Sequence, residues 1–188
     1  MAILDAWTSL YAFGIDAGVD TLTSWMRAVS LCAPRIRGGQ ALLIGETDPT
    51  LAQSLMLWNS TVLAQTELRE REQTALPPVF AAACVWGRRD AVKVTLERIG
   101  ALGGGDLSAI ETTEGMLPSV LGPVPIPQPR TIDSRELEGT ADRVKAVVRV
   151  PQSRRGELAL RLRSASARHV AAREPGELRF QLDPKERI

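Results

Sequence analysis

Residues 143–150 read RVKAVVRV, and this stretch decides the fold that the sequence predicts. Apolar side chains stand at every second position, and most of the intervening positions carry Arg or Lys. Successive side chains of a β-strand point to opposite faces of a sheet, so this alternation is typical of a strand with one buried face. Similar alternation at residues 157–163 and 177–183, with turn-forming residues between the runs, predicts a small antiparallel β meander or half-sandwich over residues 131–188.

Upstream of this region, the apolar spacing changes to three and four residues, which is typical of amphipathic helices. Residues 4–29 follow this spacing. A second helix is predicted from Asp48, a suitable N-cap, and Pro49, which suits the first helical position, to about Thr74. A third is predicted over residues 79–99. Residues 1–105 are therefore expected to form an N-terminal antiparallel helical bundle or hairpin, and the whole chain an α+β fold.

Glycine and proline dominate the segment between these two regions. Prolines alternate with other residues from Pro123 to Pro129. Proline cannot donate a backbone hydrogen bond, so such a run favours an extended, polyproline-like conformation and is excluded from the centre of a sheet. Residues 106–130 are predicted to be a linker or surface strap.

Composition and charge narrow the classes of function. The 23 basic and 22 acidic residues give a net charge of +1, so the chain as a whole has no general attraction for nucleic acid, which is an unlikely partner on this ground. The apolar N-terminal stretch lacks a basic start and is interrupted by Asp16 and Asp20, which argues against a signal peptide and a transmembrane segment. A cytoplasmic protein is expected.

Residues with catalytic or metal-binding chemistry are sparse. His169 is the single histidine, and the two cysteines are far apart in the sequence, so neither a zinc site nor a nucleophile triad is indicated. The glycine-rich residues 100–106 lack the Lys-Ser/Thr of a phosphate-binding loop and are interpreted as a helix stop. We predict no catalytic residue, metal or cofactor and expect a protein that is not an enzyme.

Two candidate surfaces remain. Aromatic side chains of the first 100 residues form either part of the core or a hydrophobic interface: Trp7, Tyr11, Trp25, Trp58 and Trp86. Basic side chains of the predicted meander form either a solvated sheet face or a surface for an acidic partner: Lys145, Arg149, Arg161, Arg163 and Arg179.

Residues 46–72, which run from Glu46-Thr47-Asp48-Pro49 to the charged Glu67–Glu72, resemble in texture the helical segments of phasins. Phasins are bacterial proteins that coat polyhydroxyalkanoate granules and do no chemistry. The resemblance covers residues 1–100 at most. It implies a non-catalytic protein whose helices associate with each other or coat a storage granule or lipid surface.

Two alternatives to this granule-coating role stay open. The first is a binding adaptor in a larger assembly, such as a secretion or phage-like particle, in which the β module pairs its edge with a strand of another protein. The second is an enzyme of unfamiliar type built on carboxylates and arginines. Under the two leading hypotheses a protein partner or self-association is expected.

Overall fold

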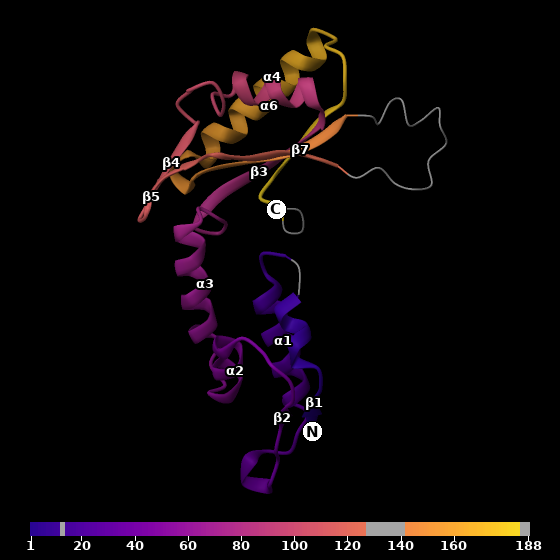
Figure 1. The fold of residues 1–188 in the computed structure, drawn as a ribbon, viewed down its shortest axis with the longest axis vertical. Coiled ribbons are helices and arrows are strands. Elements are labelled where there is room, and N and C mark those ends of the chain that lie inside the picture. Colours follow the sequence, from indigo (N-terminus) through magenta and orange to yellow (C-terminus); the bar gives the residue numbers. More distant parts are fainter. Residues whose placement is uncertain (12–13, 127–141, 185–188) are drawn as a thin grey trace, which may run out of the picture. The chain divides into compact units, whose positions relative to one another are not determined.

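The computed structural model describes residues 1–11, 14–126 and 142–184 (Figure 1). The chain divides into two compact units, Met1–Glu70 and Arg71–Ile188. The divisions expected at residues 105 and 130 both fall within the second unit.

The first unit is a set of short elements around a small core. It contains a parallel pair of very short strands, β1 (Ala2–Ile3) and β2 (Leu42–Leu43). Its helices are η1 (Ala6–Tyr11), α1 (Ala17–Val29), η2 (Arg35–Arg37), α2 (Pro49–Met56) and the start of α3 (Thr61–Gln73). Leu22, Leu51 and Leu63 form the buried cluster that joins α1, α2 and α3.

The predicted start of the second helix is confirmed. Asp48 is the N-cap of α2, and its side chain accepts hydrogen bonds from the backbone N–H groups of Thr50, at 2.8 Å, and Leu51, at 3.0 Å. These bonds satisfy two donors that a helix otherwise leaves without an intrahelical partner.

The second unit is built on a four-stranded antiparallel sheet with the strand order β6-β7-β3-β8. Its strands are β3 (Phe80–Arg88), β6 (Val120–Pro125), β7 (Arg143–Pro151) and β8 (Leu178–Leu182). Helix α4 (Arg89–Arg98) follows β3, and η3 (Gln152–Arg154) and α6 (Arg155–Ala171) follow β7. A hairpin of β4 (Ala109–Thr112) and β5 (Gly115–Pro118) lies between α4 and β6. Apart from this hairpin, the chain order β3-α4-β6-β7-α6-β8 is that of a split β-α-β, ferredoxin-like fold.

Helices α4 and α6 cover the same face of this sheet (Figure 1). Val92 and Leu96 of α4 and Leu158 and Leu162 of α6 pack on alternate residues of the two central strands. Burying this many apolar side chains is the main source of stability for the unit, at roughly 1.5–3 kcal/mol for each large side chain.

The predicted helical bundle is wrong, because helices and strands alternate in the second unit. The helix expected over residues 79–99 is a strand followed by a helix, β3 and α4. Strand β3 is a central strand whose residues from Phe80 to Val85 are buried on both faces. A strand of this kind has a continuous apolar run instead of an alternating pattern, and such a run does not distinguish a strand from a helix.

The strand predicted over residues 157–163 is also wrong, because these residues belong to α6. Leu158, Leu162, Ala165 and His169 are buried at helical spacing, whereas Leu160 is 69% exposed. The leucines of this segment alternate as they would in a strand, but the residues that are buried follow the spacing of a helix. The two flanking runs were predicted correctly and form β7 and β8.

The remaining predicted helices are shorter than the sequence suggested. The first is limited to α1 and follows Gly14, whose φ of 114° is not helical. The second is divided at Trp58, which has a φ of 53°, into α2 and α3. The expected strap over residues 106–130 contains β4, β5 and the edge strand β6, and its residues 127–130 lie outside the described part of the chain.

Candidate functional site

The sheet face opposite α4 and α6 carries the candidate site, and we call it the tryptophan face. Because residues paired across an antiparallel sheet point to the same side, the strand register defines its members. They alternate with the core residues on the three strands that follow: Phe80, Ala82, Cys84, Trp86 and Arg88 on β3; Arg143, Lys145, Val147 and Arg149 on β7; Arg179 and Gln181 on β8.

Trp86 stands at the centre of a cross-strand row on this face. It pairs with Lys145 of β7 on one side and with Arg179 of β8 on the other. Residues directly opposite in an antiparallel pair have Cβ atoms about 5 Å apart, so the side chains of Lys145 and Arg179 leave the sheet next to Trp86. Trp86 and Lys145 are half-buried, and Arg179 is exposed. The row therefore presents an aromatic surface between two positive charges.

Further charges surround this row. Arg88 and Arg143 pair with each other at the same end of the face, and Arg88 is exposed. Glu177 forms ion pairs with Arg143, at 2.8 Å, and with Arg179, at 2.9 Å. Arg88, Arg143 and Arg179 thus stand at this end of the face together with the Glu177 carboxylate, which pairs with two of them. The net charge of the whole chain does not reveal this local grouping of cations.

Arg149, at the other end of the tryptophan face, has a structural role. It is only 4% exposed and donates hydrogen bonds to the backbone carbonyl groups of Thr74 and, at 2.6 Å, Pro118. Burial lowers the pKa of its guanidinium group. The side chain therefore links β7 to the segment before β3 and to the end of β5. It is not available to a ligand.

The other two predicted basic residues lie on α6, away from the tryptophan face. Arg161 is bound to Asp106, to Glu157 and to the carbonyl group of Ile99. Hydrogen bonds from Arg161 and Arg154 hold the pKa of the Asp106 carboxyl well below its usual range. Arg163 is exposed on the same helix. The predicted basic face thus combined residues of the sheet with residues of α6, because the prediction assumed that residues 157–163 form a strand.

The predicted aromatic residues are also separated. Trp7 and Tyr11 form an edge-to-face pair on η1, with ring centroids 5.8 Å apart. Trp25 packs against the core cluster of the first unit, and Trp58 lines a pocket of that unit. Trp86 alone among the five stands on the four-stranded sheet.

Sequence reasoning did not select Arg88 as a site residue. Its position beside the Trp86 row follows from strand β3, which was predicted as a helix. The apolar run from Phe80 to Val85 suits a buried strand as well as a helix, so no local signal in the sequence selected Arg88.

Fold and surface together define a class: a ferredoxin-like domain with a half-buried tryptophan between cationic residues on the sheet face opposite its two helices. Residues 72–185 match the family described as primosomal protein N C-terminal domain. The chain belongs to that family.

Curated relatives extend the similarity over nearly the whole chain. It is 31% identical over 189 residues to the probable replication restart protein PriA of Mycobacterium leprae, a match that covers 97% of this chain and 26% of that relative. The Mycobacterium tuberculosis protein of the same name is 29% identical over 186 residues, with 97% and 27% covered. The chain thus spans about a quarter of the length of these relatives.

The family match corrects the resemblance to phasins. A primosomal domain over residues 72–185 is incompatible with a granule-coating helical protein, and the secretion or phage-particle adaptor and the unfamiliar enzyme fit no better. Ala- and Leu-rich helical texture is shared by many unrelated proteins, so it carried little information about family.

Two features of the described residues bear on the remaining predictions. No helix in the described ranges is long and apolar enough to cross a membrane. Within the same ranges, no three His, Cys, Asp or Glu side chains are placed to hold a metal ion. The absence of a cofactor and of enzymatic activity stays a prediction.

Proposed function

We propose that this chain is a non-catalytic DNA-binding module of a replication restart protein and that it binds single-stranded DNA on the tryptophan face. The observation that carries the proposal is the cross-strand row in which Trp86 lies between Lys145 and Arg179. This proposal replaces the expectation that nucleic acid is an unlikely partner, which depended on the charge of the whole chain.

The chemistry of the row suits unpaired bases. A half-buried indole keeps part of its flat surface accessible for a base to stack on, and neighbouring cations bind the phosphates on either side. Stacking is worth about 1–3 kcal/mol per base and tolerates any sequence. Bases within a duplex are already stacked on each other, so a single strand is the favoured ligand.

Four-stranded sheets with helices on one face provide a parallel. RNA-recognition domains of this architecture stack two or three bases on aromatic side chains of the uncovered sheet face. Fold similarity alone does not define function, so the proposal depends on the residues of the row and not on this parallel.

The names of the relatives favour DNA over RNA as the ligand. Both mycobacterial relatives are described as probable replication restart proteins, and replication copies DNA. A module of this kind would act in the cytoplasm and together with other proteins of a primosome.

A binding titration tests the proposal. The full chain is titrated into a fluorescently labelled oligothymidine of about 15 nucleotides at roughly 50 mM salt, and into a duplex of the same length. We expect tighter binding to the single strand. Trp86→Leu should weaken this binding by about 5- to 150-fold, the equivalent of one stacked base. Trp86→Phe should retain part of the affinity, because phenylalanine keeps an aromatic face.

Arg163→Gln provides the matched control, since Arg163 is an exposed cation on α6 and lies away from the tryptophan face. It should bind as the unsubstituted chain does. Thermal unfolding of each variant verifies that the sheet is intact. A Trp86→Leu variant that is folded and binds the single strand with unchanged affinity would refute the proposal.

A further inference from the structure

Glu177 brings a carboxylate group onto the tryptophan face. It directly precedes β8, and the alternation of side chains along an extended chain places it on the same side of the sheet as Arg179, two residues later. Its Oε2 atom pairs with Nη2 of Arg143 at 2.8 Å, and its Oε1 atom pairs with Nε of Arg179 at 2.9 Å. One carboxylate therefore links cations of β7 and β8, the two strands that flank β3.

Close contacts with β3 fix the backbone of Glu177. Its carbonyl group accepts a hydrogen bond from the N–H group of Arg88 at 2.8 Å. The same carbonyl oxygen lies so close to Gly87 that a Cβ atom added to this glycine would stand 1.9 Å from it. The Glu177 side chain is 35% exposed. The fold of the sheet therefore holds the carboxylate beside the two arginines, at a place that a ligand still reaches.

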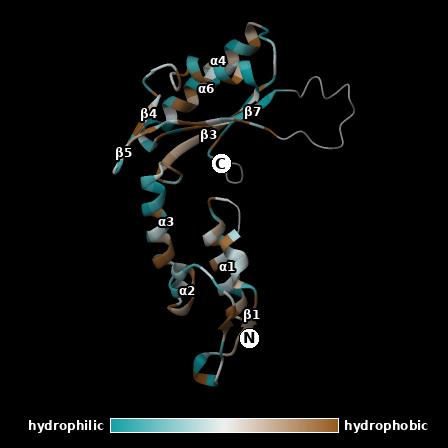
Figure 2. Cartoon of the chain, in the orientation of Figure 1, coloured by the Kyte–Doolittle hydropathy of each residue, from teal (hydrophilic) through white to brown (hydrophobic). Residues whose placement is uncertain are grey.

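The connection between α6 and β8 contains a second glutamate, which has a different role. This segment is largely hydrophilic (Figure 2). Glu174 pairs with Arg98 of α4 and lies 3.1 Å from Nδ1 of His169 on α6. These contacts join the connection to the two helices. Glu177, in contrast, makes its ion pairs with arginines of the tryptophan face, so its charge acts on that surface.

The two ion pairs of Glu177 occupy donors that a phosphate group would use. Guanidinium groups bind carboxylates and phosphates with the same N–H groups. A DNA phosphate that approaches Arg143 or Arg179 has to replace the Glu177 carboxylate or lie beside its negative charge. Exposed ion pairs are weak, so each should reduce the affinity for phosphate by about 1.5- to 5-fold. Glu177 thus lowers the affinity of the face without blocking it.

This cost differs between duplex and single-stranded DNA. A duplex carries one negative charge per about 1.7 Å of its axis, and its bases are stacked on each other. It therefore meets this face through phosphates alone, and several of them approach the carboxylate. A single strand brings fewer phosphates to Glu177 and stacks a base on Trp86, an interaction that the carboxylate does not oppose. A group that disfavours the competing ligand raises specificity.

We propose that Glu177 is a specificity-determining residue, which favours single-stranded over duplex DNA on the tryptophan face. Its negative charge weakens binding that depends on phosphates alone and leaves base stacking on Trp86 unaffected. This inference rests on the proposed function, because it requires that the Trp86 row binds DNA.

Glu177→Gln tests the inference, because glutamine keeps the shape of the side chain and removes its charge. The full chain and the variant are titrated into labelled oligothymidine of about 15 nucleotides and into a duplex of the same length at roughly 50 mM salt. The variant should bind the duplex about tenfold more tightly and the single strand about threefold more tightly, so that the preference for the single strand decreases about threefold. The salt slope for the duplex should steepen by about 0.9 for each arginine that gains a phosphate contact.

Glu177→Asp and Glu97→Gln are the matched variants. Aspartate keeps the charge and should retain most of the preference for the single strand. Glu97 is exposed on α4, which covers the other face of the sheet, so Glu97→Gln changes the net charge equally and should leave the preference unchanged. Thermal unfolding verifies that each variant is folded.

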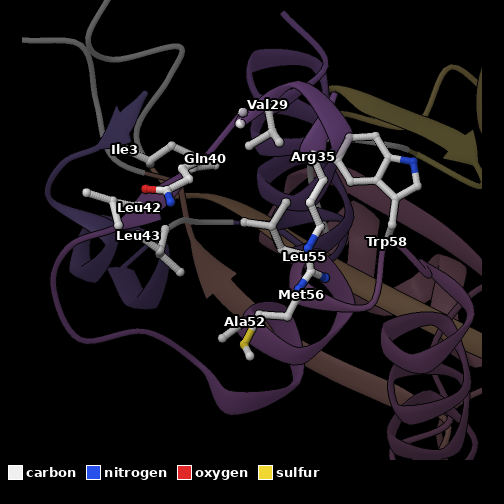
Figure 3. A pocket seen from close by; sticks show the side chains of 13 residues that line it. Ile3, Val29, Arg35, Gln40, Leu42, Leu43, Ala52, Leu55, Met56 and Trp58 are labelled. Carbon is white, nitrogen blue, oxygen red and sulfur yellow. The ribbon is translucent and has the colours of Figure 1, made fainter. Parts of the chain in front are cut away.

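Two tryptophan variants separate a failure of this inference from a failure of the proposed function. Trp86→Leu should weaken binding to the single strand. Trp58→Leu should not, because Trp58 is a 53% exposed tryptophan that lines a pocket of the first unit (Figure 3). If both variants bind the single strand as the unsubstituted chain does, the proposed function and the role of Glu177 are refuted together.

If Trp86→Leu does weaken binding, two results would overturn the role of Glu177 alone. One is a folded Glu177→Gln variant whose preference for the single strand is unchanged. The other is weaker binding of both forms of DNA by this variant, which would mean that Glu177 positions Arg143 and Arg179 for the ligand.

Discussion

Trp86 on β3 lies directly opposite Lys145 on β7, so the centre of the four-stranded sheet places an aromatic ring beside a cation on the face that the helices leave uncovered. Neighbouring strands bring together residues that are 59 positions apart in the sequence, and Arg179 completes the row from a third strand. The predictions below test this surface and the interactions that hold the sheet behind it.

The salt dependence of DNA binding should show whether the cations of the row contact phosphate groups. Each phosphate contact on a single strand contributes about 0.7 to the slope of log K against log salt concentration. The double variant Lys145→Gln/Arg179→Gln should therefore reduce the slope by about 1.4. Titrations at several salt concentrations measure it, and an unchanged slope would show that these side chains do not contact phosphate.

Removal of the buried guanidinium group should destabilise the second unit. Arg149→Met removes the buried donor to the carbonyl groups of Thr74 and Pro118. The expected loss is about 2–4 kcal/mol in the free energy of unfolding, measured in urea. Arg163→Met, at an exposed position, should change stability by less than about 0.5 kcal/mol.

A methyl group at Gly87 should disrupt the pairing of β3 with β8. Gly87 has a φ of 149°, and an added Cβ would lie 1.9 Å from the carbonyl oxygen of Glu177. Gly87→Ala should therefore cost more than about 2 kcal/mol in urea unfolding. Gly156→Ala is the control, because that helical position faces open space, and it should stabilise α6 by up to about 1 kcal/mol.

Acid should weaken the contact between α6 and the loop that follows α4. The pKa of Asp106 is lowered in the folded chain, so its ionised form favours folding at pH values above its ordinary pKa of 3.8, and this contribution is lost as the pH falls below that value. The unfolding temperature of Asp106→Asn should therefore fall less than that of the unsubstituted chain between about pH 6 and pH 3. Equal decreases would assign the acid sensitivity to other carboxylates.

Sequence alone predicted those elements whose pattern has one physical explanation. Strand β7 alternates at most positions because its two faces differ, and α2 is capped by Asp48 because the carboxylate and Pro49 both suit a helix start. Strand β3 and α6 were misassigned for opposite reasons. Strand β3 is apolar on both faces over most of its length, so its sequence does not alternate. Helix α6 shows an alternating pattern by coincidence, because the exposed Leu160 lies between two buried leucines.

The candidate site could not be predicted as a unit for the same reason. Trp86, Lys145 and Arg179 were each selected, but as parts of an aromatic surface and a basic surface in different predicted domains. Only the register of β3 against β7 and β8 brings them together, and no local pattern in the sequence specifies that register. The cationic residues of this face could not be found from the net charge either, because a net charge of +1 is compatible with cations that gather on one surface.

The order of strands along the chain also has a consequence for biosynthesis. Strand β3 ends at Arg88, and its first partner, β7, is complete only at Pro151. A ribosome that adds about 5–20 residues per second needs several seconds to produce this interval. During that time the nascent β3, rich in alanine and β-branched or aromatic neighbours, has two unpaired edges. Slow translation through α4 and β6 should therefore increase the need for chaperones.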